Sequence, residues 1–136
     1  MAEVFHTSAW DIELPTGWTV EHRSDHMWIR LPDARAELRI TPFNDQTGQL
    51  TAEQWLHVTE HFSRKRDRPV ISRRCGDFEG HETAFASAQT WIRSWALIAG
   101  GVGLDVNYRC PRPDAGRDDS VIDAVLATLR LRRAAT

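Results

Sequence analysis

The segment 10–18, Trp-Asp-Ile-Glu-Leu-Pro-Thr-Gly-Trp, constrains the fold of this chain most strongly. Ile12 and Leu14 point to one face and the acidic residues between them to the other, which predicts a half-buried strand over 9–14. The Pro-Thr-Gly sequence that follows predicts a turn, because proline fixes φ and glycine accepts a positive φ. Trp18 is then expected to pack back onto the strand. This segment indicates a fold and no particular reaction.

Length and charge limit the class of protein. A chain of 136 residues is long enough to bury its own core, so we expect one domain over 1–136 with an ordered core over about 9–131. Seventeen Lys and Arg against 19 Asp and Glu give a net charge of −2, which argues against a general nucleic-acid binder. Residues 1–8 have neither a basic start nor an apolar run, so we expect no membrane contact and a cytoplasmic protein.

The two cysteines, Cys75 and Cys110, lack the Cys-x-x-Cys spacing of redox and metal sites. Each lies in a strand-like segment. In a reducing compartment we expect both to be free, buried thiols, and the alternative is a disulfide if their strands pair.

Alternating patterns predict most of the sheet. Residues 26–31 and 36–43 alternate around a Pro-Asp turn, which predicts an antiparallel hairpin. Gly100-Gly101 predicts a tight turn with positive φ at both positions between strands 91–99 and 102–110. The pattern over 82–98 fits either one long strand or two strands joined near 87–90.

Two helices are predicted. Thr51-Ala-Glu-Gln54 matches a capping box, in which each end residue bonds the backbone amide of the other, and a helix over 52–66 should follow it. A second apolar stripe with helical spacing predicts a helix over about 120–130. The order of strands, helix, strands, helix indicates an α+β fold with a mostly antiparallel sheet flanked by helices.

Several of these positions together resemble the PsbP-like family, whose fold is shared by the extrinsic photosystem protein PsbP, a Ran-binding nuclear import factor and Eag-type secretion chaperones. The positions that carry the resemblance are Leu14 to Trp18, the helix 51–66 with Trp55, Gly80 followed by Ala84, Tyr108, and the closing helix with Ile122, Leu126 and Leu129. The resemblance implies an α/β/α sandwich around an antiparallel sheet. It also implies a binding or assembly role, because the named members work mainly in that way.

One segment has the spacing of a metal site. His57, Glu60 and His61 form His-x-x-Glu-His, the zinc-binding pattern of one class of metallopeptidase. On the predicted helix, however, His57 and His61 point away from the apolar stripe, and a catalytic zinc needs a third protein ligand. We therefore expect no metal cofactor, with His57 and His61 as an adventitious surface site at most.

The six tryptophans exceed what a core of this size requires. Trp91, Arg93 and Trp95 alternate on one strand and therefore share a face. Trp and Arg are enriched in binding hot spots, so these residues, together with Trp28, are our candidate protein-binding surface. The alternative is that this face lies beneath a helix.

The sequence therefore predicts a non-enzymatic binding protein, an adaptor or chaperone that contacts another protein or a second copy of itself, without a cofactor. A small metal-dependent hydrolase using His57, Glu60 and His61 is one alternative. A carrier of a small apolar ligand is the other.

Overall fold

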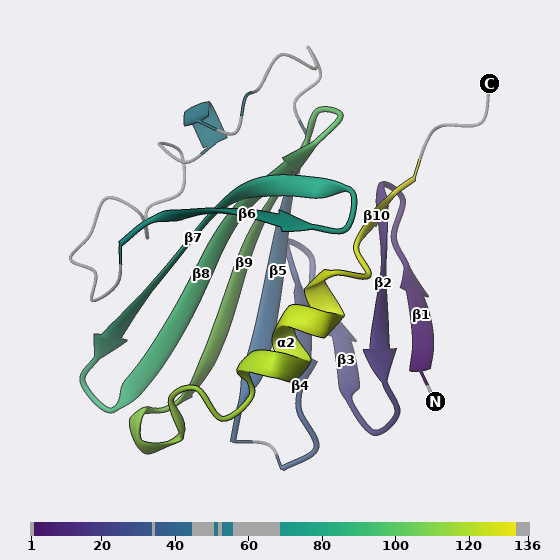
Figure 1. Cartoon of the computed structure of the whole chain (residues 1–136). Helices are drawn as coiled ribbons and strands as arrows, with labels where there is room; N and C mark the ends of the chain where they lie inside the picture. The colour runs from purple at the N-terminus through teal and green to yellow at the C-terminus, as the bar shows by residue number, and fades with distance from the viewer. Residues whose placement is uncertain (1, 34, 45–50, 52, 56–68, 133–136) are drawn as a thin grey trace.

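The computed structural model describes residues 2–33, 35–44, 51, 53–55 and 69–132 (Figure 1). In this part of the chain the larger sheet has seven strands in the order β3-β4-β5-β9-β8-β7-β6, and every neighbouring pair is antiparallel. Its strands are β3 (Thr19–His22), β4 (Met27–Arg30), β5 (Glu37–Asn44), β6 (Ile71–Cys75), β7 (Phe78–Ser87), β8 (Thr90–Ala99) and β9 (Val102–Pro111). The predicted α+β class with a mostly antiparallel sheet is confirmed.

A smaller sheet stands beside the β3 edge (Figure 1). It consists of β1 (Ala2–His6), β2 (Trp10–Pro15) and β10 (Arg130–Leu131), in the order β1-β2-β10. The predicted strand over 9–14 is β2, and Ile12 and Leu14 are fully buried as expected. The alternation of the sequence therefore placed the buried face of this strand correctly.

Helix α2 (Asp119–Leu126) lies across one face of the larger sheet, which we call the α2 face (Figure 1). It buries Ile122, Val125 and Leu126, the apolar stripe from which this helix was predicted. A 3-10 turn, η2 (Arg112–Asp114), connects it to β9. The helix ends four residues before the predicted limit, because residues 127–128 turn to bring β10 onto β2.

The main core lies between the α2 face, the helix and the small sheet. Alternate residues of the central strands point into it, since side chains alternate between the two faces of a strand. The fully buried members from β4, β5, β8 and β9 are Ile29, Leu38, Ile40, Leu97, Leu104, Val106 and Tyr108. This packing fixes which side chains of the sheet face away from α2.

Trp55 docks on the opposite face of the sheet. The predicted capping box is present, because the Thr51 amide donates to Gln54 Oε1 and the Gln54 amide donates to Thr51 Oγ1. Trp55 stacks on Phe43, and its indole N–H donates to the Leu104 carbonyl at 3.1 Å. Residues 53–55 are helical, whereas 56–68 lie outside the described residues, so helical cover of this second face stays a prediction.

The predicted turns are confirmed. Gly100 and Gly101 have φ of 51° and 81° between β8 and β9. The segment 82–98 forms two strands that meet at Ala88, whose φ is 53°. Strands β4 and β5 form the hairpin that the alternation over 26–31 and 36–43 predicted.

The β6–β7 turn holds the segment that follows α2. The Asp77 amide donates to the Leu129 carbonyl at 2.9 Å, and the Leu131 amide donates to Asp77 Oδ2 at 2.9 Å. Gly76 has φ of 62°, and a Cβ there would lie 2.0 Å from the Leu129 oxygen. Only glycine therefore allows this turn to approach the backbone before β10 so closely.

Candidate functional site

Three of the four residues of the predicted protein-binding surface lie on β8 and face α2. Trp95 and Arg93 are only 1% and 2% exposed, and Trp91 is partly buried against the core. Of the two alternatives, the structure shows the covered one at Arg93 and Trp95, which are buried, whereas Trp91 keeps part of its surface exposed. The physical reason is that α2 packs on this face of β8 and supplies carboxylates to Arg93.

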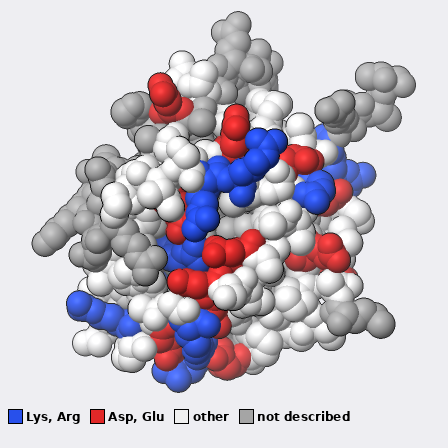
Figure 2. All heavy atoms as spheres, viewed as in Figure 1, with Lys and Arg blue, Asp and Glu red and all other residues white. Residues whose placement is uncertain are grey.

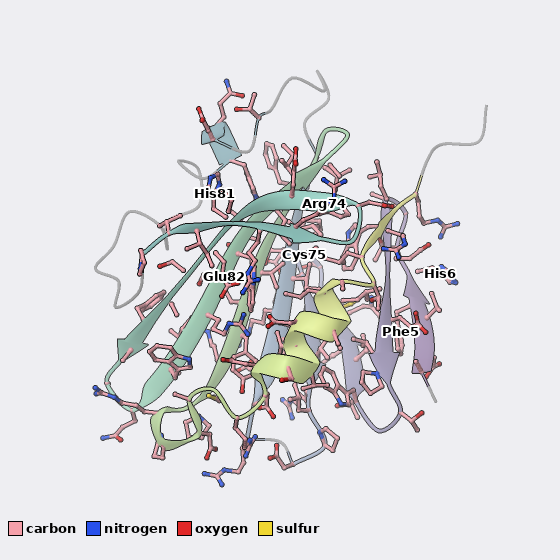
Figure 3. The ribbon with its side chains drawn as sticks, in the orientation of Figure 1. Phe5, His6, Arg74, Cys75, His81 and Glu82 are labelled. Atoms are coloured by element: carbon pink, nitrogen blue, oxygen red, sulfur yellow. The ribbon has the colours of Figure 1, made fainter. Side chains whose placement is uncertain are left out.

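Glu82, on β7, is the centre of a buried polar cluster beside β8. Arg73 Nε and the Trp95 indole N–H donate to its Oε1 at 2.8 and 3.0 Å. Arg93 donates to its Oε2 through Nε at 3.2 Å and Nη2 at 2.9 Å. Glu82 is on the α2 side of the sheet, near Cys75 (Figure 3). Four donors thus satisfy a carboxylate that is almost completely out of water.

Arg93 connects this cluster to α2. Its Nη1 donates to Asp119 at 3.1 Å and its Nη2 to Asp123 at 2.8 Å. Burial alone lowers the pKa of Arg93, but the hydrogen bonds to Asp123 and Glu82 and the charges of both outweigh it and raise the pKa. Acidic and basic side chains are accordingly mixed beside α2 and β6 (Figure 2). Because the donors of Arg73, Arg93 and Trp95 described above are bonded to carboxylates, this cluster holds the helix on the sheet and is not an open site.

Tyr108 makes a second polar contact to the start of α2. Its hydroxyl donates to Asp118, which also accepts from Arg117 at 3.2 Å. Burial, followed by this hydrogen bond, raises the pKa of the Tyr108 phenol. The phenol is therefore a fixed donor at neutral pH, and it anchors the helix N-terminus over β9.

Trp28 is the fourth predicted residue, and it lies on the face of the sheet opposite α2. Three guanidinium groups surround its indole ring, with the Cζ atoms of Arg30, Arg23 and Arg39 at 4.0, 5.0 and 5.3 Å from the ring centroid. We call Trp28 and these three arginines the Trp28 face. The indole nitrogen is buried, and no group in the described residues accepts a hydrogen bond from it. A ring this close to three cations gains cation–π attraction.

The charges of the Trp28 face are only partly balanced. Arg23 pairs with Glu21 at 3.1 Å and Arg39 pairs with Glu37 at 3.0 Å. Arg30 is exposed and has no carboxylate within 4.0 Å in the described residues. Three cations against two anions leave this face positive on a chain whose net charge is −2.

The sequence analysis did not identify the three arginines that surround Trp28. Alternation placed Arg30 on the same face of the strand as Trp28, so that neighbour was predictable. Arg39 depends on the β4–β5 register, in which it stands opposite Trp28. Arg23 depends on the β3–β4 turn, which no pattern in the sequence located.

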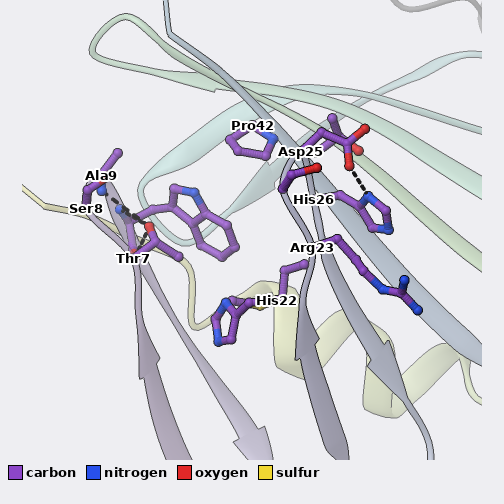
Figure 4. Close-up of a pocket in the computed structure, with 12 residues that line it drawn as sticks. Thr7, Ser8, Ala9, His22, Arg23, Asp25, His26 and Pro42 are labelled. Atoms are coloured by element: carbon purple, nitrogen blue, oxygen red, sulfur yellow. Dashed lines mark hydrogen bonds and ion pairs between the residues drawn. The ribbon is translucent and has the colours of Figure 1, made fainter.

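A cleft of about 480 Å³ lies between the small sheet and the β3–β4 turn (Figure 4). Its lining residues are Thr7, Ser8, Ala9, Trp10, His22, Arg23, Ser24, Asp25, His26, Met27, Thr41 and Pro42. His26 bonds Asp25 at 2.6 Å, and this contact lowers the pKa of the Asp25 carboxyl. The cleft combines an apolar wall with a rim of hydroxyl and imidazole groups, and its volume lies in the range that small molecules occupy.

The alternative metal site cannot be placed on this framework. His57, Glu60 and His61 lie outside the described residues. Among the residues that the structure does describe, no group of three His, Cys, Asp or Glu is arranged to hold a metal ion. Cys75 and Cys110 are free and buried, so the expected pair of thiols is confirmed. Nor is any described helix long and apolar enough to cross a membrane.

Comparison with solved structures shows which known fold this chain has. No family model matches the sequence, and no curated protein matches it either. The structure is similar to that of a Bacteroides thetaiotaomicron VPI-5482 protein, with a TM-score of 0.64 and 17% identity over 91% of this chain. The match spans 45% of the Bacteroides chain, so this chain has about half the length of that neighbour.

A second similar structure is the solution structure of cyanobacterial PsbP (CyanoP) from Synechocystis sp. PCC 6803. The TM-score is 0.62 at 11% identity, and the match covers 96% of this chain and 92% of CyanoP. At 11% identity the structural similarity is evidence for a shared fold and not for a shared function. The nearly complete coverage of both chains confirms the resemblance drawn from the sequence: this chain has a PsbP-like fold.

Proposed function

We propose that this protein is a non-enzymatic binding protein, and that the Trp28 face binds an acidic segment of another polypeptide. The observation that carries the proposal is the set of three guanidinium groups around one half-buried indole. Trp and Arg are enriched in binding hot spots, and here they are preassembled on strands β4 and β5 and the β3–β4 turn.

Charge complementarity indicates the kind of partner. Arg30 has no carboxylate partner in the described residues, so a carboxylate from another chain would gain a charge-assisted hydrogen bond without breaking an existing pair. Arg30 also lies against the Trp28 ring, which fixes its guanidinium and reduces the entropy lost on binding. An acidic segment therefore fits this face better than a basic or neutral one.

Binding of a decaglutamate peptide, measured by calorimetry at low salt, tests the proposal. We expect Arg30→Glu to weaken binding at least about tenfold, because it replaces the unpaired cation with a repelling anion. Arg74→Glu is the matched control, since Arg74 is 71% exposed on β6, at the opposite edge of the sheet. Equal binding by the wild type and both variants would contradict the proposal.

Sedimentation of the same proteins distinguishes a second copy from a foreign partner. We expect a monomer for the wild type and for Arg30→Glu. A wild-type dimer that Arg30→Glu dissociates would mean that the Trp28 face binds another copy of this chain instead.

The cleft beside Trp10 supports a second candidate function, in which the protein carries a small molecule with an apolar part. Its volume and its apolar wall of Trp10, Met27 and Pro42 are the observations in favour. Titration with an apolar fluorescent dye tests this candidate. We expect Pro42→Glu, which places a charge in the wall, to abolish the signal, and an unchanged signal would exclude the cleft as the binding site.

A further inference from the structure

Arg109 is a further cation on the face of the sheet that carries Trp28. It lies on β9 directly opposite Glu37 of β5, and Glu37 lies directly opposite Arg30 of β4. Arg30, Glu37 and Arg109 therefore form one row across three strands. Side chains in such a row point to the same face of a sheet.

No group in the described residues uses the charge of Arg109. Its Nε is buried, and among the residues that the structure describes no group accepts a hydrogen bond from it and no carboxylate lies within 4.0 Å of its guanidinium. Glu37, the nearest acid in the register, is engaged by Arg39 at 3.0 Å. A buried donor without a partner carries a desolvation cost that an incoming acceptor would remove.

Arg109 also lines a cavity of about 380 Å³ where β8 begins and β9 ends. The other lining residues are Arg35, Glu37, Gln89, Thr90, Cys110 and Pro111. Arg35 contributes a second guanidinium, which pairs with Asp114 at 3.2 Å, and Gln89 and Thr90 contribute a neutral amide and a hydroxyl. The wall is fixed, because the Arg112 amide donates to the Gln89 carbonyl at 2.7 Å.

We infer that this cavity holds a carboxylate of the acidic partner, with Arg109 as its main donor. The inference rests on the proposed function and says where the second anchor of the partner lies. Two guanidinium groups, an amide and a hydroxyl can all donate to a carboxylate, and Glu37 is the one carboxylate in the lining that opposes it.

The row also sets the spacing of the partner's acids. Arg30 and Arg109 are separated by two strand spacings of roughly 4.8 Å each, about 10 Å in all. An extended peptide covers that distance in about three residues, at roughly 3.3 Å per residue. The partner segment therefore carries two acidic residues about three positions apart, one for Arg30 and one for Arg109.

The test is a double-mutant cycle with two peptides that differ at one acid. The first peptide has Glu at positions 3 and 6 of a Gly-Ser background, and the second has Gln in place of the second Glu. Against the first peptide, we expect Arg109→Gln to weaken binding by about tenfold, and against the second to have almost no further effect. Arg74→Gln is the control. Arg109→Gln should keep the wild-type melting temperature, because Arg109 makes no ion pair with any described residue that the substitution could break.

The outcomes separate the two proposals. If Arg30→Gln weakens binding and Arg109→Gln does not, this inference is wrong and the proposed function stands. If neither variant weakens binding, both are wrong. Inorganic phosphate and acetate, compared as competitors at equal ionic strength, identify the oxyanion. Stronger, Arg109-dependent competition by phosphate would overturn the assignment to a carboxylate.

Discussion

Glu82 and Arg93 lie on neighbouring strands, and two hydrogen bonds of 2.9 and 3.2 Å to one carboxylate oxygen join them beneath α2. Arg93 also stacks on Trp95, with its Cζ 4.6 Å from the ring centroid. The pair fixes the position of α2, because the same guanidinium bonds Asp119 and Asp123 of the helix. Residues that suggested a binding surface in the sequence are therefore the joint between the helix and the sheet.

Removing one member of this pair should destabilise the protein strongly. Arg93→Leu leaves the buried carboxylate of Glu82 without two of its donors, and we expect a loss of about 3 to 5 kcal/mol in the free energy of unfolding. Urea denaturation followed by circular dichroism measures it. The exposed pair Arg74–Glu79 is the control, and Arg74→Leu should cost less than about 1 kcal/mol. Equal losses for the two variants would contradict a buried joint.

Gly80 should not tolerate a side chain. A Cβ at Gly80 would lie 1.8 Å from the Ala96 carbonyl oxygen, and a backbone atom in the middle of a sheet cannot move away. We expect Gly80→Ala to cost about 3 kcal/mol, the upper end of the usual range for an overpacked site. At Gly103 the same methyl would meet the Trp55 ring at 3.0 Å, and a side chain can shift. Chemical denaturation should therefore rank Gly103→Ala as the milder substitution, and the reverse order would contradict this packing.

Trp55 and Trp18 differ in how deeply the structure buries them. Trp55 is 4% exposed and stacks on Phe43, whereas Trp18 is only partly buried against the core. We expect Trp55→Ala to cost about 3 to 5 kcal/mol, since it opens a cavity and removes an indole hydrogen bond. Trp18→Ala should cost less. Melting temperatures of the two variants decide the order, and a near-wild-type value for Trp55→Ala would mean that this ring is not core.

Cys75 should make stability fall at alkaline pH. Burial, with a contribution from the Glu82 charge, raises the pKa of the Cys75 thiol from 9.0 to about 11. Between these values the unfolded chain loses a proton that the folded chain retains, so the unfolded state is favoured as the pH rises. Unfolding free energies measured across this window should fall more steeply for the wild type than for Cys75→Ala. Identical slopes would contradict the raised pKa.

The same burial should protect both thiols from reagents. Only the thiolate reacts, and burial raises the pKa of Cys110 as well. We therefore expect an aromatic disulfide reagent to label Cys75 and Cys110 slowly at pH 8 in the native protein and rapidly in denaturant. Fast native labelling of Cys75 would contradict its buried position at the end of β6.

Local signals in the sequence predicted much of this fold. The Thr51–Gln54 capping box, the Gly100–Gly101 turn and the alternation along β4 and β5 each depend on residues a few positions apart, and each is present. Strand β1 was not predicted, because four of its five residues are exposed and its sequence therefore has no alternation of buried and exposed positions. Strand β10 has only two residues, too few for any pattern.

The functional surfaces were harder to predict because they depend on register. Arg93 meets Asp119 and Asp123 only because α2 crosses β8, 26 and 30 residues later in the chain. Arg39 reaches Trp28 through the pairing of β4 with β5, and Arg109 joins the row through the pairing of β5 with β9. Alternation identifies the face on which a side chain lies. It does not identify the neighbouring strand.

The attachment of β10 to β2 has a consequence for folding during synthesis. Glu13 and Thr128 are hydrogen-bonded although 115 residues separate them, and β10 is held by the β6–β7 turn. On the ribosome, β2 therefore emerges early and keeps one edge unpaired until almost every other described segment has been made. An unpaired strand edge invites wrong pairing with other chains. A nascent chain of this protein should thus be most prone to aggregation in the interval before β10 emerges.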